Sequence, residues 1–321
     1  MREVLLKELL VLTDEEQAIV QTDKAVRKEL YTSQQHFVIE SEKFLNPDKM
    51  IMIRKHTRFV DFPKHRHNYI ELNYVFNGQL RQKVGNKALT LRKGELLFLN
   101  QHIEHEIAAS QTEDIIINFI IQPEFFEFIF SFLTSENMVT DFLINSLYNT
   151  SQNGQFLFFK VAHVKEIQAL IQKIIWEMMR PTALSEPTIK LYMGLLMLEL
   201  TKHLEKIEHD EAYTHQHQLL IEVLNYIESH FKDGSLQALA EQLNQTHYGL
   251  SKVIKKETGA TFKALLQKKR LSKARELLET TQTPIAMIVE QVGYDNMSYF
   301  YRIFKKKYGV TPNQYRQQRM T

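Results

Sequence analysis

The sequence contains no cysteine, only ten glycines and seven prolines, and a single tryptophan. The absence of cysteine excludes disulfide bonds, thiolate metal ligands and a cysteine nucleophile, and it fits a reducing cytoplasm. No stretch approaches the roughly 20 apolar residues that a membrane helix needs. Lys7 and Glu8 interrupt the first apolar run, unlike the continuous core of a signal peptide. We therefore expect a cytoplasmic protein with no membrane partner.

The residues that are present are typical of a folded protein with more than one domain. The chain has 321 residues, of which 44% are hydrophobic and 24% are charged, and this length exceeds what one compact core usually holds. The net charge of +2 conceals an asymmetry, because residues 216–321 hold 16 Lys and Arg against 9 Asp and Glu, which leaves 24 against 29 elsewhere. A basic C-terminal third favours a nucleic-acid partner, although a merely solvated basic face would carry the same charge.

The apolar pattern divides the chain into four expected segments. Residues 1–35 are expected to be helical, with Thr13 and Glu16 spaced as a capping box. Residues 36–122 alternate short apolar runs with turn residues, which predicts an all-β domain of successive hairpins. Residues 123–210 return to a helical period and run into a polar linker, "HDEAYTHQHQ"; their apolar stripes are typical of core packing and could add a dimer interface. Residues 216–321 form the fourth segment.

The basic fourth segment contains an internal repeat. "SKVIKKETGAT" (251–261) superposes on "YRIFKKKYGVT" (301–311), and "LQALAEQL" (236–243) matches "IAMIVEQV" (285–292). Each copy joins a short apolar-periodic helix to a helix with a basic outer face, which predicts helix-turn-helix units at about 235–257 and 284–307. A helix capped by Thr261 is expected between them. Its roughly 19 residues would span about 28 Å, near the roughly 34 Å between successive major-groove faces of DNA.

The outer faces of the second helices carry the candidate DNA contacts. Arginine can bond guanine edges bidentately, Asn, Ser and Thr can bond base edges, and lysines suit phosphates. A solvated amphipathic helix would also be basic outside, but the repetition of the same charges favours DNA binding. The candidates are Thr246, Tyr248, Ser251, Lys252, Lys255 and Lys256 in the first unit, and Asn296, Ser298, Tyr299, Arg302, Lys305 and Lys306 in the second.

The second unit resembles the DNA-binding domain of the AraC/XylS family of bacterial transcription regulators. "VGYDNMSYFYRIFKKKYGVTPNQYR" (292–316) carries the resemblance, and "KRLSKARELLETTQTPI" (269–285) is similar to the family's linking helix. The chain departs from the family at Val289, where alanine is usual, and at Ile254, where an aromatic residue is common. The resemblance implies a regulator that binds double-stranded DNA as a homodimer, and that contacts RNA polymerase if it is an activator.

"HRHNYIE" (65–71) places two histidines and a glutamate close together, and alternate side chains of a strand share a face. Many members of the family carry an N-terminal cupin-type barrel that senses a small molecule, and residues 65–78 and 94–107 are similar to the two cupin motifs. The resemblance implies a polar effector pocket, for which the candidate lining residues are His65, His67, Tyr69, Glu71, Tyr74, Phe98, His102 and His105.

We predict no resident metal in this pocket. Asn100 and His102 stand where cupins usually have a proline and a glycine before the last histidine, which weakens the resemblance to a metal site. Three imidazoles and one carboxylate would suit Fe, Mn, Ni or Zn. A metal, if one were bound, would be held by His65, His67, Glu71 and His105.

The expected fold class is multidomain α+β, with an N-terminal cupin-like β-barrel and helical segment followed by an all-α double helix-turn-helix domain. The expected function is sequence-specific regulation of transcription under the control of a small-molecule effector, without enzymatic activity. The sequence is also compatible with two alternatives. One is a metal-dependent cupin enzyme with an appended DNA-binding domain, and the other is an architectural protein that binds DNA irrespective of its sequence.

Overall fold

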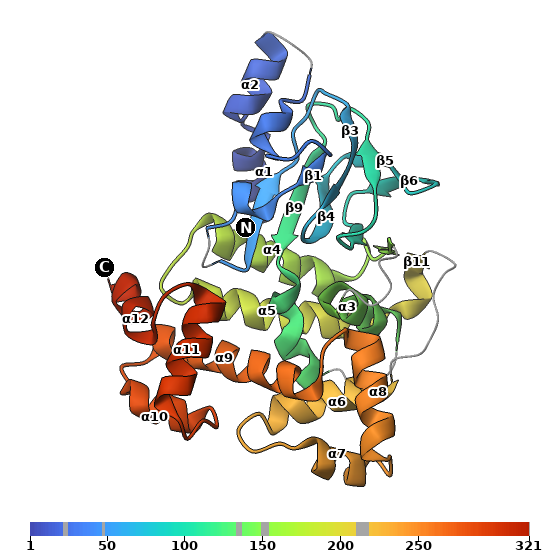
Figure 1. Cartoon of the computed structure of the whole chain (residues 1–321). Helices are drawn as coiled ribbons and strands as arrows, with labels where there is room; N and C mark the ends of the chain where they lie inside the picture. The colour runs from blue at the N-terminus through green and yellow to red at the C-terminus, as the bar shows by residue number, and fades with distance from the viewer. Residues whose placement is uncertain (22–24, 47–48, 133–136, 149–153, 210–217, 321) are drawn as a thin grey trace. The chain divides into compact units, whose positions relative to one another are not determined.

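A computed structural model describes residues 1–21, 25–46, 49–132, 137–148, 154–209 and 218–320 (Figure 1). The chain forms two compact units, residues 1–216 and residues 217–321. Most of the predicted polar linker, residues 210–217, lies outside the described residues. The predicted α+β class is confirmed, because the first unit contains β-sheets and the described part of the second is helical. Among the helices that are described, none combines the length and apolarity needed to cross a membrane.

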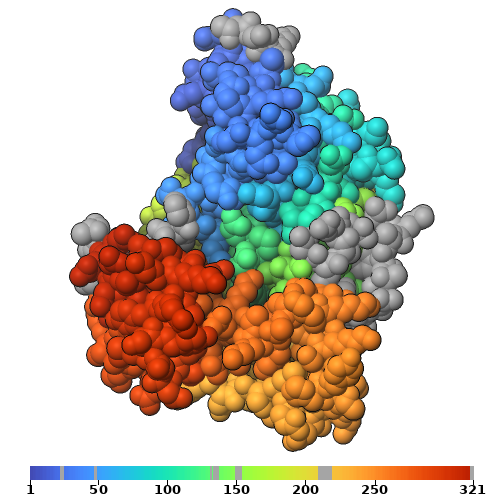
Figure 2. Space-filling model, viewed as in Figure 1, coloured from blue at the N-terminus to red at the C-terminus, as the bar shows by residue number. Residues whose placement is uncertain are grey.

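The first unit opens with two short helices, α1 (Arg2–Leu10) and α2 (Asp14–Gln21), and a 3₁₀ turn, η1 (Lys28–Leu30). The predicted capping box at the start of α2 is present. The N–H of Glu16 donates to Oγ1 of Thr13 at 3.2 Å, and the N–H of Thr13 donates to the carboxylate of Glu16 at 2.9 Å. In the space-filling view these N-terminal residues, coloured blue, form a continuous surface with the strands that follow them (Figure 2).

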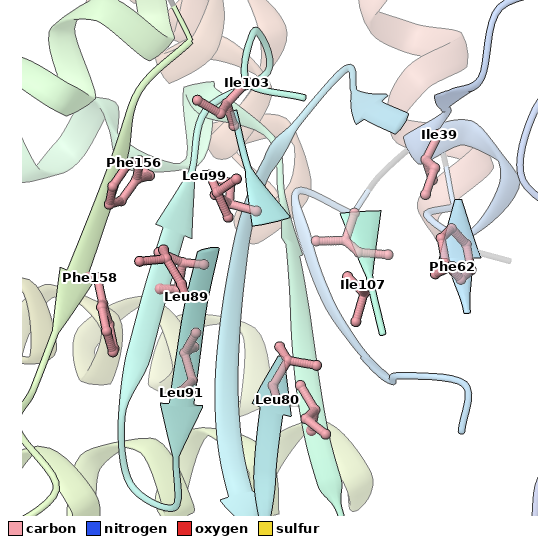
Figure 3. Packing of buried hydrophobic residues seen from close by; sticks show 14 of the residues in the cluster. Ile39, Phe62, Leu80, Leu89, Leu91, Leu99, Ile103, Ile107, Phe156 and Phe158 are labelled. Carbon is pink, nitrogen blue, oxygen red and sulfur yellow. The ribbon is translucent and has the colours of Figure 1, made fainter. Parts of the chain in front are cut away.

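Two sheets pack around one apolar core in the first unit. The strand order is β1-β3-β8-β5-β6 in one sheet and β11-β10-β7-β4-β9-β2 in the other. Ile39, Phe62 and Ile107 from the first sheet and Leu99 and Phe158 from the second belong to the shared core (Figure 3). The strands up to residue 121 are β1 (Val38–Ile39), β2 (Ile51–Lys55), β3 (Phe62–His67), β4 (Ile70–Asn77), β5 (Gln79–Val84), β6 (Lys87–Arg92), β7 (Leu96–Leu99), β8 (His105–Ile107) and β9 (Ile115–Ile121), with a 3₁₀ turn, η2 (Ser41–Lys43), after β1.

The six-stranded sheet takes two strands from the segment that was expected to be helical. β10 (Phe156–Phe159) pairs with β7, and β11 (Ile207–His209) pairs with β10. All four residues of β10 are buried, so the strand lacks the alternation of apolar and polar residues by which a strand is usually detected. The helices of this segment are η3 (Pro123–Ser131), α3 (Met138–Tyr148), α4 (Lys165–Met179), α5 (Ser185–Thr201) and η4 (Leu204–Lys206).

The second unit repeats a three-helix pattern after its first helix. The helices are α6 (Gln218–Ser229), α7 (Leu236–Gln242), α8 (His247–Thr258), α9 (Phe262–Thr280), α10 (Ile285–Gln291), α11 (Met297–Tyr308) and α12 (Pro312–Met320). Thr261 caps α9 as predicted, because its hydroxyl accepts the N–H of Ala264 at 3.2 Å. Gly259 and Gly309 follow α8 and α11 in the left-handed region, with φ of +66° and +79°. The repeat in the sequence is therefore a repeat of helices, caps and helix ends.

Candidate ligand cavity and nucleic-acid interface

A cluster of buried ionisable side chains lies between the two sheets of the first unit. The candidate ligand nitrogens of His65, His67 and His105 all lie within 4.8 Å of one another, and His65 of β3 is the register partner of His105 of β8. Nε2 of His67 is 3.4 Å from Nε2 of His105, and the Glu71 carboxylate oxygens lie 3.7 and 3.8 Å from these two nitrogens. The structure thus brings together the four residues that the two motifs contributed.

Burial sets the protonation of this cluster. It lowers the pKa of His65 to about 4 and holds the pKa values of His67 and His105 well below their usual range. Burial also raises the pKa of Glu71 to about 7. At neutral pH the imidazoles are uncharged, and each can offer a nitrogen lone pair to a ligand.

The donor set fits a divalent transition-metal ion. Two nitrogens each about 2.1 Å from a tetrahedral metal would lie roughly 3.4 Å apart, close to the separation of the His67 and His105 nitrogens. Nδ1 of His65 donates to the carbonyl of Pro63 at 2.7 Å, and Nδ1 of His105 is 2.8 Å from Oε1 of Gln82. Such contacts leave Nε2 of each ring for coordination. The spacing of His67 and His105 therefore suits a metal, whereas two bonds of about 2.1 Å span at most roughly 4.2 Å, less than the 4.8 Å range of the three histidines.

Asn100 stabilises the turn in which the motif departs from the cupin pattern. Its side-chain oxygen accepts the N–H of His102 at 3.2 Å, of Ile103 at 3.2 Å and of Gln155 at 2.9 Å. These hydrogen bonds to the Asn100 amide oxygen stabilise the turn at the position where cupins usually have proline and glycine.

A small cavity that opens to solvent lies beside the cluster. Nε2 of His56 and Oε2 of Glu71 are buried there and have no hydrogen-bond partner among the described residues. Unpartnered polar atoms next to a cavity are the atoms that a polar ligand would satisfy. The lining residues are Tyr31, Ile39, Phe44, Arg54, His56, Thr57, Phe62, His65, Tyr69, Glu71, Ile107, Asn118 and Ile120.

Five of the eight residues expected to line the pocket are not among its lining residues: His67 and His105 belong to the histidine cluster beside it, and the other three lie elsewhere. The hydroxyl of Tyr74 donates to Oε1 of Gln168 on α4 at 2.7 Å, and Phe98 packs edge-on against Phe142 and Phe159. Residues three apart on a strand point to opposite faces, so Glu71 and Tyr74 of β4 cannot share the cavity. His102 lies in the turn before β8 and is not among the residues that line the cavity.

In the second unit, α8 and α11 present the basic faces that the repeat predicted. Tyr248 is 79% exposed. Lys252, Lys255 and Lys256 of α8 are exposed, as are Ser298, Arg302, Lys305 and Lys306 of α11. Lys307 is exposed too, although it was not among the candidates; the run of three lysines at 305–307 was the signal for it.

Three other candidates, Thr246, Asn296 and Tyr299, contribute to the structure of α8 and α11. The side chains of Thr246 and Asn296 cap α8 and α11, because each accepts a backbone N–H three residues later, at 3.0 and 2.8 Å. Tyr299 is half-buried, and its hydroxyl accepts a hydrogen bond from Gln267 of α9 at 3.0 Å. Arg302 lies 5.3 Å over the ring of Tyr299. Ser251 is half-buried as well.

The two helix-turn-helix units are tied together through Arg270 of α9. Its guanidinium donates to the carbonyls of Phe231 at 2.7 Å and Lys232 at 2.8 Å, and it lies 5.3 Å over the ring of Tyr294. Gly293 precedes that tyrosine with φ of +82°, and a Cβ there would lie 2.2 Å from the carbonyl oxygen of Lys232. The turn of the second helix-turn-helix thus packs directly on the loop that precedes the first helix-turn-helix, within the same compact unit.

Comparisons with known proteins agree with this division of the chain. Residues 239–318 match the model of a helix-turn-helix domain, and residues 49–190 match that of an AraC-like ligand binding domain. The HTH-type transcriptional activator RhaS of Escherichia coli O81 (strain ED1a) is 25% identical over 268 residues, which cover 81% of this chain and 89% of RhaS.

One solved structure is similar to about a third of the chain, and another is similar to most of it. The C-terminal domain of AraT, a response regulator from Geobacillus stearothermophilus, is 47% identical over 32% of this chain and 87% of that domain, with a TM-score of 0.31. ToxT from Vibrio cholerae O395 is 16% identical over 83% of this chain and 96% of ToxT, with a TM-score of 0.34.

Proposed function

Because this chain belongs to the AraC/XylS family as a DNA-binding transcription regulator with an N-terminal ligand-binding domain, we propose that its second unit reads a specific sequence of double-stranded DNA under the control of an effector in the first. The observation that carries this proposal is the duplicated helix-turn-helix with a basic face on each second helix. Arg302 is the residue best suited to a guanine edge, and Lys252, Lys255, Lys256, Lys305 and Lys306 are suited to phosphates.

Regulation would act through a shift between conformations. A ligand that binds one arrangement of the dimer more tightly would increase the population of that arrangement, and with it the affinity for DNA. The effector would bind in the cavity beside His65 and Glu71, where unpartnered polar atoms are available. No catalysis is required, and the relative RhaS is by its name a transcriptional activator.

A homodimer is supported by an apolar seam on α5. Leu184, just before the helix, and Leu191 and Leu195 within it are 71%, 67% and 53% exposed. Their spacing of seven and four residues is that of a coiled-coil seam, which a second copy of the helix would cover. A dimer would bring two DNA-binding units to paired half-sites. The regulator would act in the cytoplasm, and it would contact RNA polymerase if it is an activator.

Substitution of Arg302 tests the reading of sequence. The bound sites are first mapped across the genome of the host, and one of them then serves as the specific DNA. We expect Arg302→Ala to weaken specific binding by about 5- to 150-fold, the equivalent of one lost bidentate base contact, with little effect on random DNA.

Lys305→Ala is the matched control on the same helix. Loss of one phosphate contact should weaken binding to specific and random DNA alike and reduce the slope of log K against log salt by about 1. Equal losses from Arg302→Ala on both kinds of DNA would show that the protein binds DNA without reading it, as an architectural protein does.

A further inference from the structure

Three side chains that line the cavity bind a carboxylate that the protein itself supplies. Glu15 of α2 is bound by three donors: Nη2 of Arg54 and Oγ1 of Thr57 donate to Oε2 at 2.5 and 3.1 Å, and the hydroxyl of Tyr31 donates to Oε1 at 2.6 Å. Arg54 also lies 4.6 Å over the ring of Tyr31. We call Tyr31, Arg54 and Thr57 the carboxylate cradle.

All three residues of the carboxylate cradle line the cavity, whereas Glu15 does not. Tyr31 and Thr57 are buried, at 1% and 3% exposure, and the Arg54 side chain is 27% exposed. Charge-assisted hydrogen bonds from a guanidinium and two hydroxyls are strong when the acceptor is anionic. The cradle therefore combines a built anion site with access from the cavity.

The rest of the cavity limits the chemistry of a ligand. Phe44 and Phe62 contribute apolar walls, and His56 and Glu71 contribute unpartnered polar atoms. Arg54 supplies one positive charge, which balances one carboxylate. A dianionic phosphate would add a second negative charge beside Glu71 without a cation to pair it. A small molecule with one carboxylate, an apolar body and a hydrogen-bonding group at its far end matches these features.

We propose that the effector is a small organic carboxylate whose carboxyl group takes the place of Glu15 in the carboxylate cradle. The proposal rests on the effector control proposed above and specifies its chemical class. Glu15 is then an internal competitor, and binding of the effector releases it from Arg54. The rest of α2 stays anchored, because the neighbouring Glu16 pairs with Arg58 at 2.7 Å and with Lys55 at 2.8 Å.

Chemical rescue tests the cradle directly in the full-length protein. Glu15→Ala removes a fragment that corresponds to acetate and leaves the cradle without its own carboxylate. Sodium acetate is titrated at constant ionic strength, with a chelator present, and the melting temperature of the first unit is measured. We expect acetate to raise the melting temperature of Glu15→Ala in a saturable way. Its apparent Kd for acetate should be at least about tenfold lower than that of the wild type, where Glu15 competes.

Neutral and mutational controls isolate the anion site. Acetamide, which has the same shape without the charge, should produce no saturable rise. Adding Arg54→Ala to Glu15→Ala should abolish the acetate response, and Asp14→Ala, which removes an exposed carboxylate from the same helix, should behave as the wild type. Glu15→Ser is measured in parallel, so that a poorly folded Glu15→Ala does not decide the result.

Three results would overturn the proposal: equal responses to acetate and acetamide, an acetate response that persists without Arg54, or equal affinities in the wild type and the Glu15 variants. The readout does not depend on DNA, so the two proposals fail separately. An acetate response combined with non-specific DNA binding would reject the proposed function, whereas specific DNA binding without rescue would reject the carboxylate effector.

Discussion

The two units differ in the exposure of their charged groups, because the first unit buries several of them and the second unit keeps its charged groups at or near the surface. The first unit buries Glu16, Arg58 and Glu71, with exposures of 0%, 0% and 3%, as well as four histidines. In the described part of the second unit the buried side chains are apolar or aromatic apart from Thr258, and the lysines and arginines lie at or near the surface. A buried charge is costly unless it is paired, whereas an exposed charge costs little. Charge in the first unit thus fixes structure and shapes a cavity, and charge in the second is available to a partner.

The largest expected effect comes from removing a buried cation. Arg58 holds Glu16 through two hydrogen bonds, at 2.7 and 3.0 Å, and donates to the carbonyls of Thr112 and Leu10. We expect Arg58→Ala to lower the free energy of unfolding by about 3 to 5 kcal/mol, because it leaves a buried carboxylate incompletely paired. The fluorescence of Trp176, the single tryptophan, reports urea unfolding of the first unit.

The exposed Arg66 of β3 provides the control for this measurement. Arg66→Ala should change the free energy of unfolding by less than about 0.5 kcal/mol. Similar losses in the two variants would remove the distinction between interior and surface charge.

The second expected effect is a dependence of stability on acid. Burial alone would raise the pKa of Glu16, but hydrogen bonds from Arg58 and Lys55 outweigh it and lower the pKa from 4.5 to about 2. A carboxyl whose pKa is lower in the folded state contributes stability above its unfolded pKa and loses it as the pH falls towards the folded value. The first unit should therefore lose on the order of 3 kcal/mol from this group between about pH 4.5 and pH 2.

Unfolding by urea at a series of pH values measures this loss, and Glu16→Gln identifies its source. The variant should be less stable at pH 7 and should lack the Glu16 part of the acid slope. An unchanged slope in Glu16→Gln would assign the acid sensitivity to other groups.

The third and smallest expected effect concerns the histidine cluster. If its geometry holds a metal, Co²⁺ at about 100 times its Kd should stabilise the first unit by about 2.7 kcal/mol and produce the visible absorption of a coordinated ion. His67→Ala should abolish both signals. His163→Ala, which removes an exposed histidine of the same unit, should retain them, and equal responses from the two variants would exclude the cluster as the site.

The sequence was most informative where neighbours along the chain decide the structure. The repeat predicted both helix-turn-helix units, and the cap formed by Thr261 and the capping box of Thr13 and Glu16 were visible as local spacings. The histidine cluster was also accessible, because two short motifs contributed all of its members.

Contacts between residues far apart in the chain could not be predicted from local spacing. Glu15 and Arg54 are separated by 39 positions, and neither stands in a motif, so their ion pair could not be predicted. The grouping of Tyr74 with Glu71 was wrong for a different reason, because residues three apart on one strand point to opposite faces, and Tyr74 contacts α4. β10 was missed because a fully buried strand has no alternation.

The contact between Arg270 and the loop at Phe231 and Lys232 has a consequence for how regulation can work. It joins both helix-turn-helix copies to α9, so the fold of the second unit sets the distance between α8 and α11. On DNA, the second unit would present α8 and α11 at one fixed separation. The effector proposed for the first unit would then change whether the second unit binds an operator, but it would not change the separation of α8 and α11, which is set by the fold of the second unit.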